Sequence, residues 1–287
     1  MQTETPRRRP IRLTRRGRIA LVAVGAVVVG TSIAVPMALP GGQPAEPGSL
    51  TVPEGWRADQ VYTAVDKALA LRAGTTRKEV PTMRLALPAD ARGNPEGYLL
   101  PATYPVTAKT TPRSLLSSMV NNANKRFRAG PVAAGASGAS TLNLYQTVTI
   151  ASIIQTEADD KTDMGKVARV IHNRLEQGMP LQMDSTIDYV LNRSTSHSDN
   201  DDARVDTPYN TYTRTGLPPT PIASPGDQAL RAAVAPPPGD WLYFVTVKPG
   251  DTRFTAEYED HQRNVTEFNQ NQNQNQSPAA PSPSPTS

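Results

Sequence analysis

Residues 143–191 read NLYQTVTIASIIQTEADDKTDMGKVARVIHNRLEQGMPLQMDSTIDYVL, and they hold the clearest structural pattern in the chain. Apolar residues recur every three or four positions over 143–158 and again over 164–177, which predicts two helices. Gly178, with Pro180 two residues later, is a typical helix stop. The stretch therefore indicates two helices, a turn and a polar segment.

Elements of other kinds flank this stretch. On its N-terminal side, residues 50–52 have the pattern of a strand that ends in a turn, and 58–71 have helical apolar spacing. On its C-terminal side, Ser224 precedes Pro225 and two further polar or small residues, which predicts a serine N-cap and a helix over 225–234.

The remaining signals define the fold class. Residues 241–247 and 252–256 are two β-rich runs separated by Lys-Pro-Gly-Asp, which predicts a β-hairpin. Helices and strands are mixed without βαβ alternation, so we expect an α+β fold. The small-residue run 130–140 predicts a linker between a small lobe, 50–129, and a larger mixed α+β lobe, 141–268.

The composition excludes several kinds of site. The 287 residues include no cysteine, which excludes disulfides, thiol nucleophiles and cysteine-ligated metals. The three histidines, His172, His197 and His261, are widely scattered and do not suggest a histidine-rich metal site. We therefore expect neither a metal nor a cofactor.

The 30 basic and 26 acidic residues are distributed unevenly. Seven arginines stand against one glutamate in 1–18, residues 19–39 have no charge, and the remainder has slightly more acid than base. The basic character belongs to a terminal tail rather than to a phosphate-binding face, so nucleic acid is not an expected partner.

The uncharged run 19–39 is 21 residues long, enough for one helix to cross a hydrocarbon layer of roughly 30 Å. A cleaved signal peptide is the alternative, but its apolar region is usually about 7–15 residues long, and no clean A-x-A site precedes Pro40. The arginines predict that 1–18 are cytoplasmic and that the body of this single-pass cell-membrane protein is extracytoplasmic. We expect 40–49 to be a linker and 269–287 a disordered tail.

Glu157 is the catalytic candidate that the pattern itself indicates. It follows Ile153 and Ile154 by four and three positions, which places it on the apolar face of its helix. Desolvation there would raise the pKa of its carboxyl and make it a proton donor near neutral pH. A side chain that turns to solvent, or pairs with Lys161, fits the same spacing.

Amides, hydroxyls and aromatic rings surround this candidate in the sequence. Residues 181–186 read LQMDST, 209–212 read YNTY, and prolines stiffen the loop 216–222. Tyrosine faces with neighbouring amides suit a carbohydrate, since the rings cover apolar sugar faces and the amides bond hydroxyl and acetamido groups. Turn residues with a core tyrosine pair would give the same pattern.

Six segments, in order, make the chain recognisable. They are Glu54-Gly55, EGYLLPATYPV (96–106), TIASIIQTEA (149–158), KVARVIHNRLEQGMPLQMDSTIDYVL (166–191), YNTYTRTGLPPTPIASPG (209–226) and WLYFVTV (241–247). With them the chain resembles the YceG-like family of endolytic murein transglycosylases, bacterial cell-wall enzymes, over about residues 50–268. A single N-terminal transmembrane helix also fits that family.

The resemblance implies a site and its partners. Glu157 matches the catalytic acid of the family, and the small lobe would be LysM-like. The expected partners are peptidoglycan glycan strands and the cytoplasmic membrane, with cell-wall synthases as protein partners. The residues that would line or support the glycan groove are Asn173, Arg174, Gln182, Asp184, Tyr209, Asn210 and Thr211.

The implied activity is that of a lyase, a membrane-anchored lytic transglycosylase. It would cleave the MurNAc–GlcNAc bond within glycan strands, leave 1,6-anhydro-MurNAc ends, and trim or terminate nascent strands. Two alternatives stay open: a glycan-binding or division scaffold without turnover, and a hydrolytic muramidase that uses Glu157 with Asp184 or Asp188.

The chain departs from the family pattern in three places. Gln155 stands where the family often has a second glutamate, and Arg253 stands where a histidine is usual. The small lobe is also short.

Overall fold

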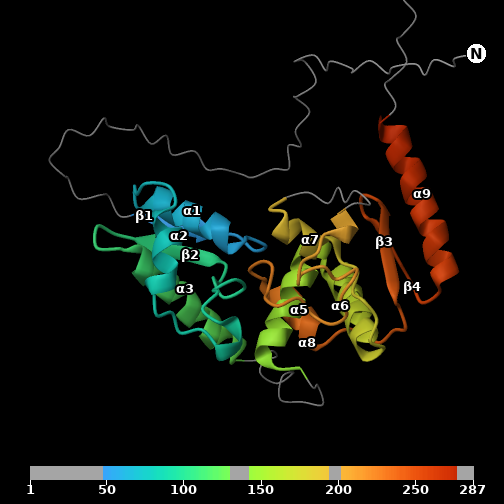
Figure 1. Cartoon of the computed structure of the whole chain (residues 1–287), viewed down its shortest axis with the longest axis horizontal. Helices are drawn as coiled ribbons and strands as arrows, with labels where there is room; N and C mark the ends of the chain where they lie inside the picture. The colour runs from blue at the N-terminus through green and yellow to red at the C-terminus, as the bar shows by residue number, and fades with distance from the viewer. Residues whose placement is uncertain (1–47, 130–141, 194–201, 277–287) are drawn as a thin grey trace, which may run out of the picture. The chain divides into compact units, whose positions relative to one another are not determined.

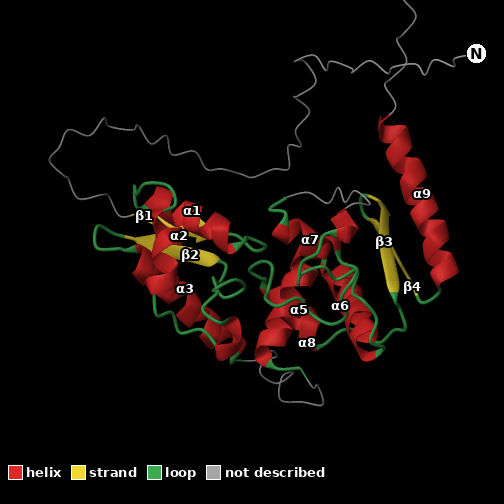
Figure 2. Ribbon diagram, viewed as in Figure 1, coloured by secondary structure: helices red, strands yellow, loops and turns green. Residues whose placement is uncertain are grey.

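The computed structural model describes residues 48–129, 142–193 and 202–276 (Figure 1). These residues form eight α-helices and two antiparallel sheets of two strands each (Figure 2), which confirms the mixed α+β class. Among the described helices, none combines the length and apolarity needed to cross a membrane. The predicted tail 1–18, span 19–39 and linker 130–140 lie outside the described residues.

The first part of the described chain packs helices against a small sheet. Leu50 lies opposite Tyr104 in that sheet, and both side chains are buried together with Val61 and Val65 of the neighbouring helix. The strand predicted at 50–52 is confirmed, but it begins at Gly48, so the last two residues of the predicted linker 40–49 belong to the strand. The elements, in chain order, are β1 (Gly48–Val52), α1 (Ala58–Ala68), α2 (Thr75–Glu79), two short 3₁₀ turns (Val80–Thr82, Ala89–Ala91), β2 (Ala102–Val106) and α3 (Pro112–Phe127).

The second part is built around one buried helix. Its elements are α5 (Leu144–Glu157), α6 (Lys161–Glu176), α7 (Asp184–Val190), a 3₁₀ turn (Asp202–Arg204), α8 (Asp227–Val234), β3 (Tyr243–Lys248), β4 (Asp251–Thr255) and α9 (Tyr258–Gln276). Val148, Ile150, Ala151, Ile153 and Ile154 of α5 are all fully buried. A helix that is apolar on nearly every side belongs in a core, and α6, α7 and α8 all contact it.

Both helices predicted within 143–191 are confirmed. The first ends at Glu157, so the catalytic candidate is the last residue of α5. The second begins at Lys161 rather than at residue 164, because the Asp160 side chain accepts hydrogen bonds from the N–H groups of Thr162 and Asp163. This N-cap adds a polar first turn that apolar periodicity does not reveal.

The predicted N-cap at Ser224 is wrong. Helix α8 begins at Asp227, with Gly226 as its N-cap. Ser224 is instead held in a backbone exchange, since its N–H donates to the carbonyl of Trp56 and its carbonyl accepts the N–H of Gly55, each at 2.8 Å. These long-range bonds move the helix start two residues further along the chain.

The predicted β-hairpin is confirmed as β3 and β4, with Phe244 opposite Phe254. Helix α9 follows and runs to Gln276, eight residues into the stretch expected to be a disordered tail. The Asn271 side chain donates to the carbonyl of Val247 in β3 at 2.9 Å. Extending an existing helix is far easier than nucleating one, so α9 can continue into a segment with few apolar groups. The contact with β3 stabilises this extension.

The two parts share one hydrophobic core. The Tyr98 ring lies 5.3 Å from Phe127 and 6.1 Å from Tyr145 at the start of α5. Arg57, just before α1, donates to the carbonyl of Asp188 in α7 at 3.0 Å. The lobe boundaries at 129 and 141 stay a prediction, but the residues on either side of them pack together.

Candidate active site

The carboxylate of Glu157, at the end of α5, meets the first turn of α7. The hydroxyl of Ser185 donates to Glu157 Oε1 at 2.6 Å, and the Ser185 N–H approaches the same oxygen at 3.3 Å. The Glu157 side chain is half-buried. The spacing also allowed an ion pair between Glu157 and Lys161. In the described part of the chain no such pair is seen, and the partner of the Glu157 carboxylate is Ser185.

Burial raises the pKa of the Glu157 carboxyl to about 7. The charges of Asp184 and Asp188 act in the same direction, whereas the two hydrogen bonds from Ser185 lower the pKa by favouring the charged form. At neutral pH the carboxyl is therefore protonated in a large fraction of molecules. That is the state that a general acid needs, and the same group can serve as a base once it has given up its proton.

Thr211 holds the start of α7 and is itself only 2% exposed. Its Oγ1 accepts the Met183 N–H at 3.0 Å and bonds the Thr186 hydroxyl at 3.0 Å, and its carbonyl accepts the Gln182 N–H at 2.9 Å. Thr211 was predicted to line or support the groove. The structure places it under the backbone that carries Ser185.

Asp184 lies next to Ser185 at the beginning of α7 and is half-buried. The Tyr212 hydroxyl donates a hydrogen bond to Asp184 Oδ1. Burial and this bond raise the pKa of the Tyr212 hydroxyl, so Tyr212 remains a neutral donor. Among the predicted groove residues, Asp184 is the one whose charge acts on Glu157.

Asn173 and Arg174 hold the hairpin against α6. The Asn173 amide donates to the Trp241 carbonyl at 2.9 Å. Arg174 is 5% exposed and donates to the carbonyls of Leu242 at 2.6 Å and Leu181 at 2.7 Å. Donors engaged with backbone in this way position other elements, and their role as direct sugar contacts stays a prediction.

The exposed Gln182 accepts a hydrogen bond from Arg174 Nη1 at 3.0 Å. Its φ of +52° lies in the left-handed region, and the N–H bond to the Thr211 carbonyl holds it there. Gln182 thus presents a side chain at the surface between Arg174 and α7. This exposed placement suits a groove residue better than the placements of Asn173 and Arg174, which are engaged with backbone carbonyls.

Tyr209 and Asn210 lie in the loop that follows the 3₁₀ turn. The Tyr209 ring packs on Tyr189 at 5.3 Å, and its hydroxyl bonds Thr220 at 2.9 Å. The fully buried Asn210 donates to backbone carbonyls within its own loop. A hollow of about 510 Å³ is lined by residues of the 208–219 segment, Asn210 and Thr211 among them, but not by Glu157, Ser185 or Asp184.

The buried carboxylate of Glu96 was not singled out by the sequence. It is 3% exposed and accepts hydrogen bonds from the Ala58 N–H at 3.0 and 3.1 Å and from the Tyr189 hydroxyl at 3.1 Å. Burial raises the pKa of Glu96 to about 7. Glu96 thereby joins the start of α1 to the end of α7, the helix whose first turn meets Glu157.

Within the three described ranges, no group of three or more His, Asp or Glu side chains is placed to hold a metal ion.

The chain can now be compared with known proteins. The YceG-like family matches residues 33–267. The chain belongs to the YceG-like family. A solved structure of a YceG-like protein from Listeria monocytogenes is 28% identical, with a TM-score of 0.64, and the match covers 76% of each chain.

Two similar proteins bear the name endolytic murein transglycosylase. The one from Bacillus subtilis is 35% identical over 58% of this chain and 46% of its own length. The one from Streptococcus pneumoniae strain R6 is 32% identical over 78% of this chain and 46% of its own length. The chain thus spans about half the length of the curated relatives that it matches.

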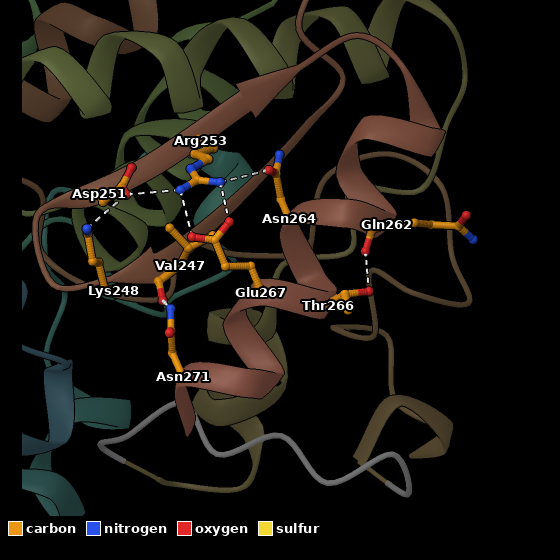
Figure 3. A network of polar contacts seen from close by, with 9 residues as sticks. All are labelled: Val247, Lys248, Asp251, Arg253, Gln262, Asn264, Thr266, Glu267 and Asn271. Carbon is orange, nitrogen blue, oxygen red and sulfur yellow. Dashed lines mark hydrogen bonds and ion pairs between the residues drawn. The ribbon is translucent and has the colours of Figure 1, made fainter. Parts of the chain in front are cut away.

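The structure shows what two of the three departures of this YceG-like chain from the family pattern do, those at Gln155 and Arg253. The Gln155 side chain accepts the Gly226 N–H at 2.8 Å, so it completes the start of α8. Arg253 forms a two-pronged ion pair with Glu267 of α9, at 2.6 and 2.8 Å (Figure 3). Arg253 therefore joins β4 to α9.

Proposed function

We propose that this YceG-like chain is an endolytic lytic transglycosylase that cleaves the MurNAc–GlcNAc bond within peptidoglycan strands. The observation that carries the proposal is the single carboxyl of Glu157, whose pKa of about 7 suits a group that first donates and then accepts a proton. Family membership and the names of the relatives give independent support.

The reaction needs only one such group. Protonated Glu157 gives its proton to the glycosidic oxygen as the bond from that oxygen to C1 of muramic acid breaks. The muramic acid C6 hydroxyl then attacks C1, and its proton returns to Glu157. The product ends in a 1,6-anhydro ring, no water is consumed, and proximity within the sugar replaces a bound nucleophile.

The surroundings of Glu157 support this route over hydrolysis. A hydrolytic muramidase needs a second carboxylate across the sugar, at roughly 5–5.5 or 6.5–9.5 Å from the first depending on the mechanism. Asp184 is bonded by the Tyr212 hydroxyl, and Asp188 is 6% exposed within α7. Both aspartates belong to α7, the short helix that also carries Ser185.

We further propose that residues 19–39 anchor the chain in the cytoplasmic membrane with the catalytic part outside. The uncharged run and the preceding arginines support this placement. An anchored enzyme of this kind acts on strands close to the membrane, where nascent glycan and the cell-wall synthases are found. Trimming or terminating those strands is the corresponding cellular role.

The decisive experiment is digestion of purified glycan strands, with the products analysed by mass. Anhydro ends are lighter than hydrolytic ends by one water and resist borohydride reduction. Glu157→Gln retains the size of the side chain but cannot supply a carboxylic proton, so turnover should fall by at least about 100-fold. Glu176→Gln, at the exposed end of α6, is the matched control and should keep normal turnover.

Three outcomes would contradict the proposal. Full activity of Glu157→Gln would place the acid elsewhere. Reducible ends, or oxygen-18 from labelled water in the product, would identify a muramidase. Strand binding without any cleavage by the wild-type chain would identify a scaffold.

A further inference from the structure

Ser185 directs both of its hydrogen-bond donors at one oxygen of Glu157. The hydroxyl is 2.6 Å from Oε1 and the backbone N–H is 3.3 Å from the same atom. We propose that Ser185 is the positioning residue of Glu157. By bonding Oε1, it leaves Oε2 as the oxygen that gives and takes the proton. This inference rests on the proposed function.

The assignment of the two oxygens follows from donor chemistry. A backbone N–H can only donate, so Oε1 must face it with a lone pair in either protonation state. The hydroxyl hydrogen also satisfies Oε1. In the neutral acid the proton is therefore on Oε2, and after transfer both donors stabilise the negative charge through Oε1.

Ser185 can act in this way because its own backbone is fixed. The residues on either side of Asp184 and Ser185 are tied to Thr211, through the Met183 N–H at 3.0 Å and the Thr186 hydroxyl at 3.0 Å. Thr186 also donates to the Met183 carbonyl at 2.7 Å. The serine thus projects from a closed turn, which holds the carboxylate of Glu157 in one orientation.

The charged groups around Glu157 and the hydrogen bonds from Ser185 have opposite effects on the pKa of Glu157. The charges of Asp184 and Asp188 in α7 act on Glu157, and the Tyr212 hydroxyl is a neutral donor to Asp184. Burial and the two aspartates raise the pKa of Glu157, while the Ser185 bonds lower it. Removing the hydroxyl leaves only the backbone N–H of Ser185 to oppose the raising effects, so the pKa of Glu157 rises.

The test compares Ser185→Ala with Ser185→Thr in the full chain, using purified glycan strands from pH 5 to pH 10. Activity needs protonated Glu157, so it declines as the pH passes the pKa of Glu157. In Ser185→Ala this alkaline decline should move up by about one pH unit, the size expected for one hydrogen bond to a charged group. The turnover at low pH should fall roughly tenfold because orientation is lost.

Ser185→Thr keeps the hydroxyl and should restore the wild-type pH profile. Thr156→Ala is the matched control, because that hydroxyl lies next to Glu157 in α5 but donates to the carbonyls of Ser152 and Ile153. It should leave both the rate and the profile unchanged. A residue with only a structural role would lower the rate without moving the profile.

An NMR titration of ¹³C-labelled glutamate, with the Glu157 signal assigned by its loss in Glu157→Gln, measures the same pKa without turnover. An unchanged or lowered pKa in Ser185→Ala, or an equal shift in Thr156→Ala, would overturn the inference. Failure of the proposed function shows separately, as reducible products or as normal turnover of Glu157→Gln.

Discussion

Exchange of Glu96 for glutamine should make the stability of the protein less dependent on pH. The folded protein raises the pKa of this carboxyl from 4.5 to about 7, mainly through burial. The unfolded chain therefore loses its proton at lower pH than the folded one. The resulting penalty on folding is absent below about pH 4.5 and complete above about pH 7, so stability falls as the pH rises between them.

The size of the effect follows from the displacement of the pKa. At about 1.4 kcal/mol per pH unit, a displacement from 4.5 to about 7 costs the folded state roughly 3 kcal/mol, most of it between pH 5 and pH 8. Glutamine cannot ionise, yet its oxygen can accept the Ala58 N–H and its amide can donate to the Tyr189 hydroxyl. The variant should therefore fold.

Urea unfolding at pH 5 and pH 8 measures this difference. The loss of unfolding free energy between the two pH values should be about 2–3 kcal/mol smaller in Glu96→Gln than in the wild type. Glu157→Gln should reduce the loss in the same direction, since burial raises the pKa of that carboxyl too. Glu176→Gln controls for the removal of one acidic group. An identical pH dependence in Glu96→Gln and the wild type would refute the burial argument.

Two further predictions concern packing. Gly97→Ala should lower the free energy of unfolding in urea by at least about 2 kcal/mol, because φ is +78° and the new Cβ would lie 2.5 Å from Pro221 Cβ. Gly178→Ala should lower it by only about 1 kcal/mol, because φ is +65° but no neighbour lies within 4 Å of the new Cβ. Equal losses in the two variants would contradict the steric reasoning. Arg253→Ala should speed hydrogen exchange in α9 by removing the ion pair with Glu267, whereas Arg263→Ala, whose ion pair with Asp260 lies within α9, should not.

The sequence predicted what periodicity and turn chemistry encode. Helices α5 and α6 and the β3–β4 hairpin were found because each repeats an apolar pattern between clear stop signals. Glu157 could be singled out as a candidate because a carboxylate on an apolar helix face is conspicuous. The start of α8 was misplaced because backbone bonds from Ser224 to residues about 170 positions earlier leave no mark in the local pattern.

The polar contacts of the site could not be predicted for the same reason. Ser185 lies 28 residues from Glu157, and nothing in the LQMDST segment distinguishes the serine from its neighbours. The resemblance implies that Arg174 is a groove residue, and in the structure it donates to the carbonyls of Leu242 and Leu181 and to the side chain of Gln182. Residues that hold a site together and residues that touch a ligand have the same polar character in a sequence.

Helix α7 links these observations into one arrangement. Its first turn gives Ser185 to the carboxylate of Glu157, while its other end gives the Tyr189 hydroxyl to the carboxylate of Glu96. Arg57 donates to the Asp188 carbonyl and lies 5.5 Å over the Tyr189 ring, so the same end is docked on the chain that precedes α1. Because a seven-residue helix has little stability of its own, these contacts and Thr211 determine where it lies. The orientation of the Glu157 carboxylate therefore depends on the N-terminal part of the fold as well as on the helix that bears it.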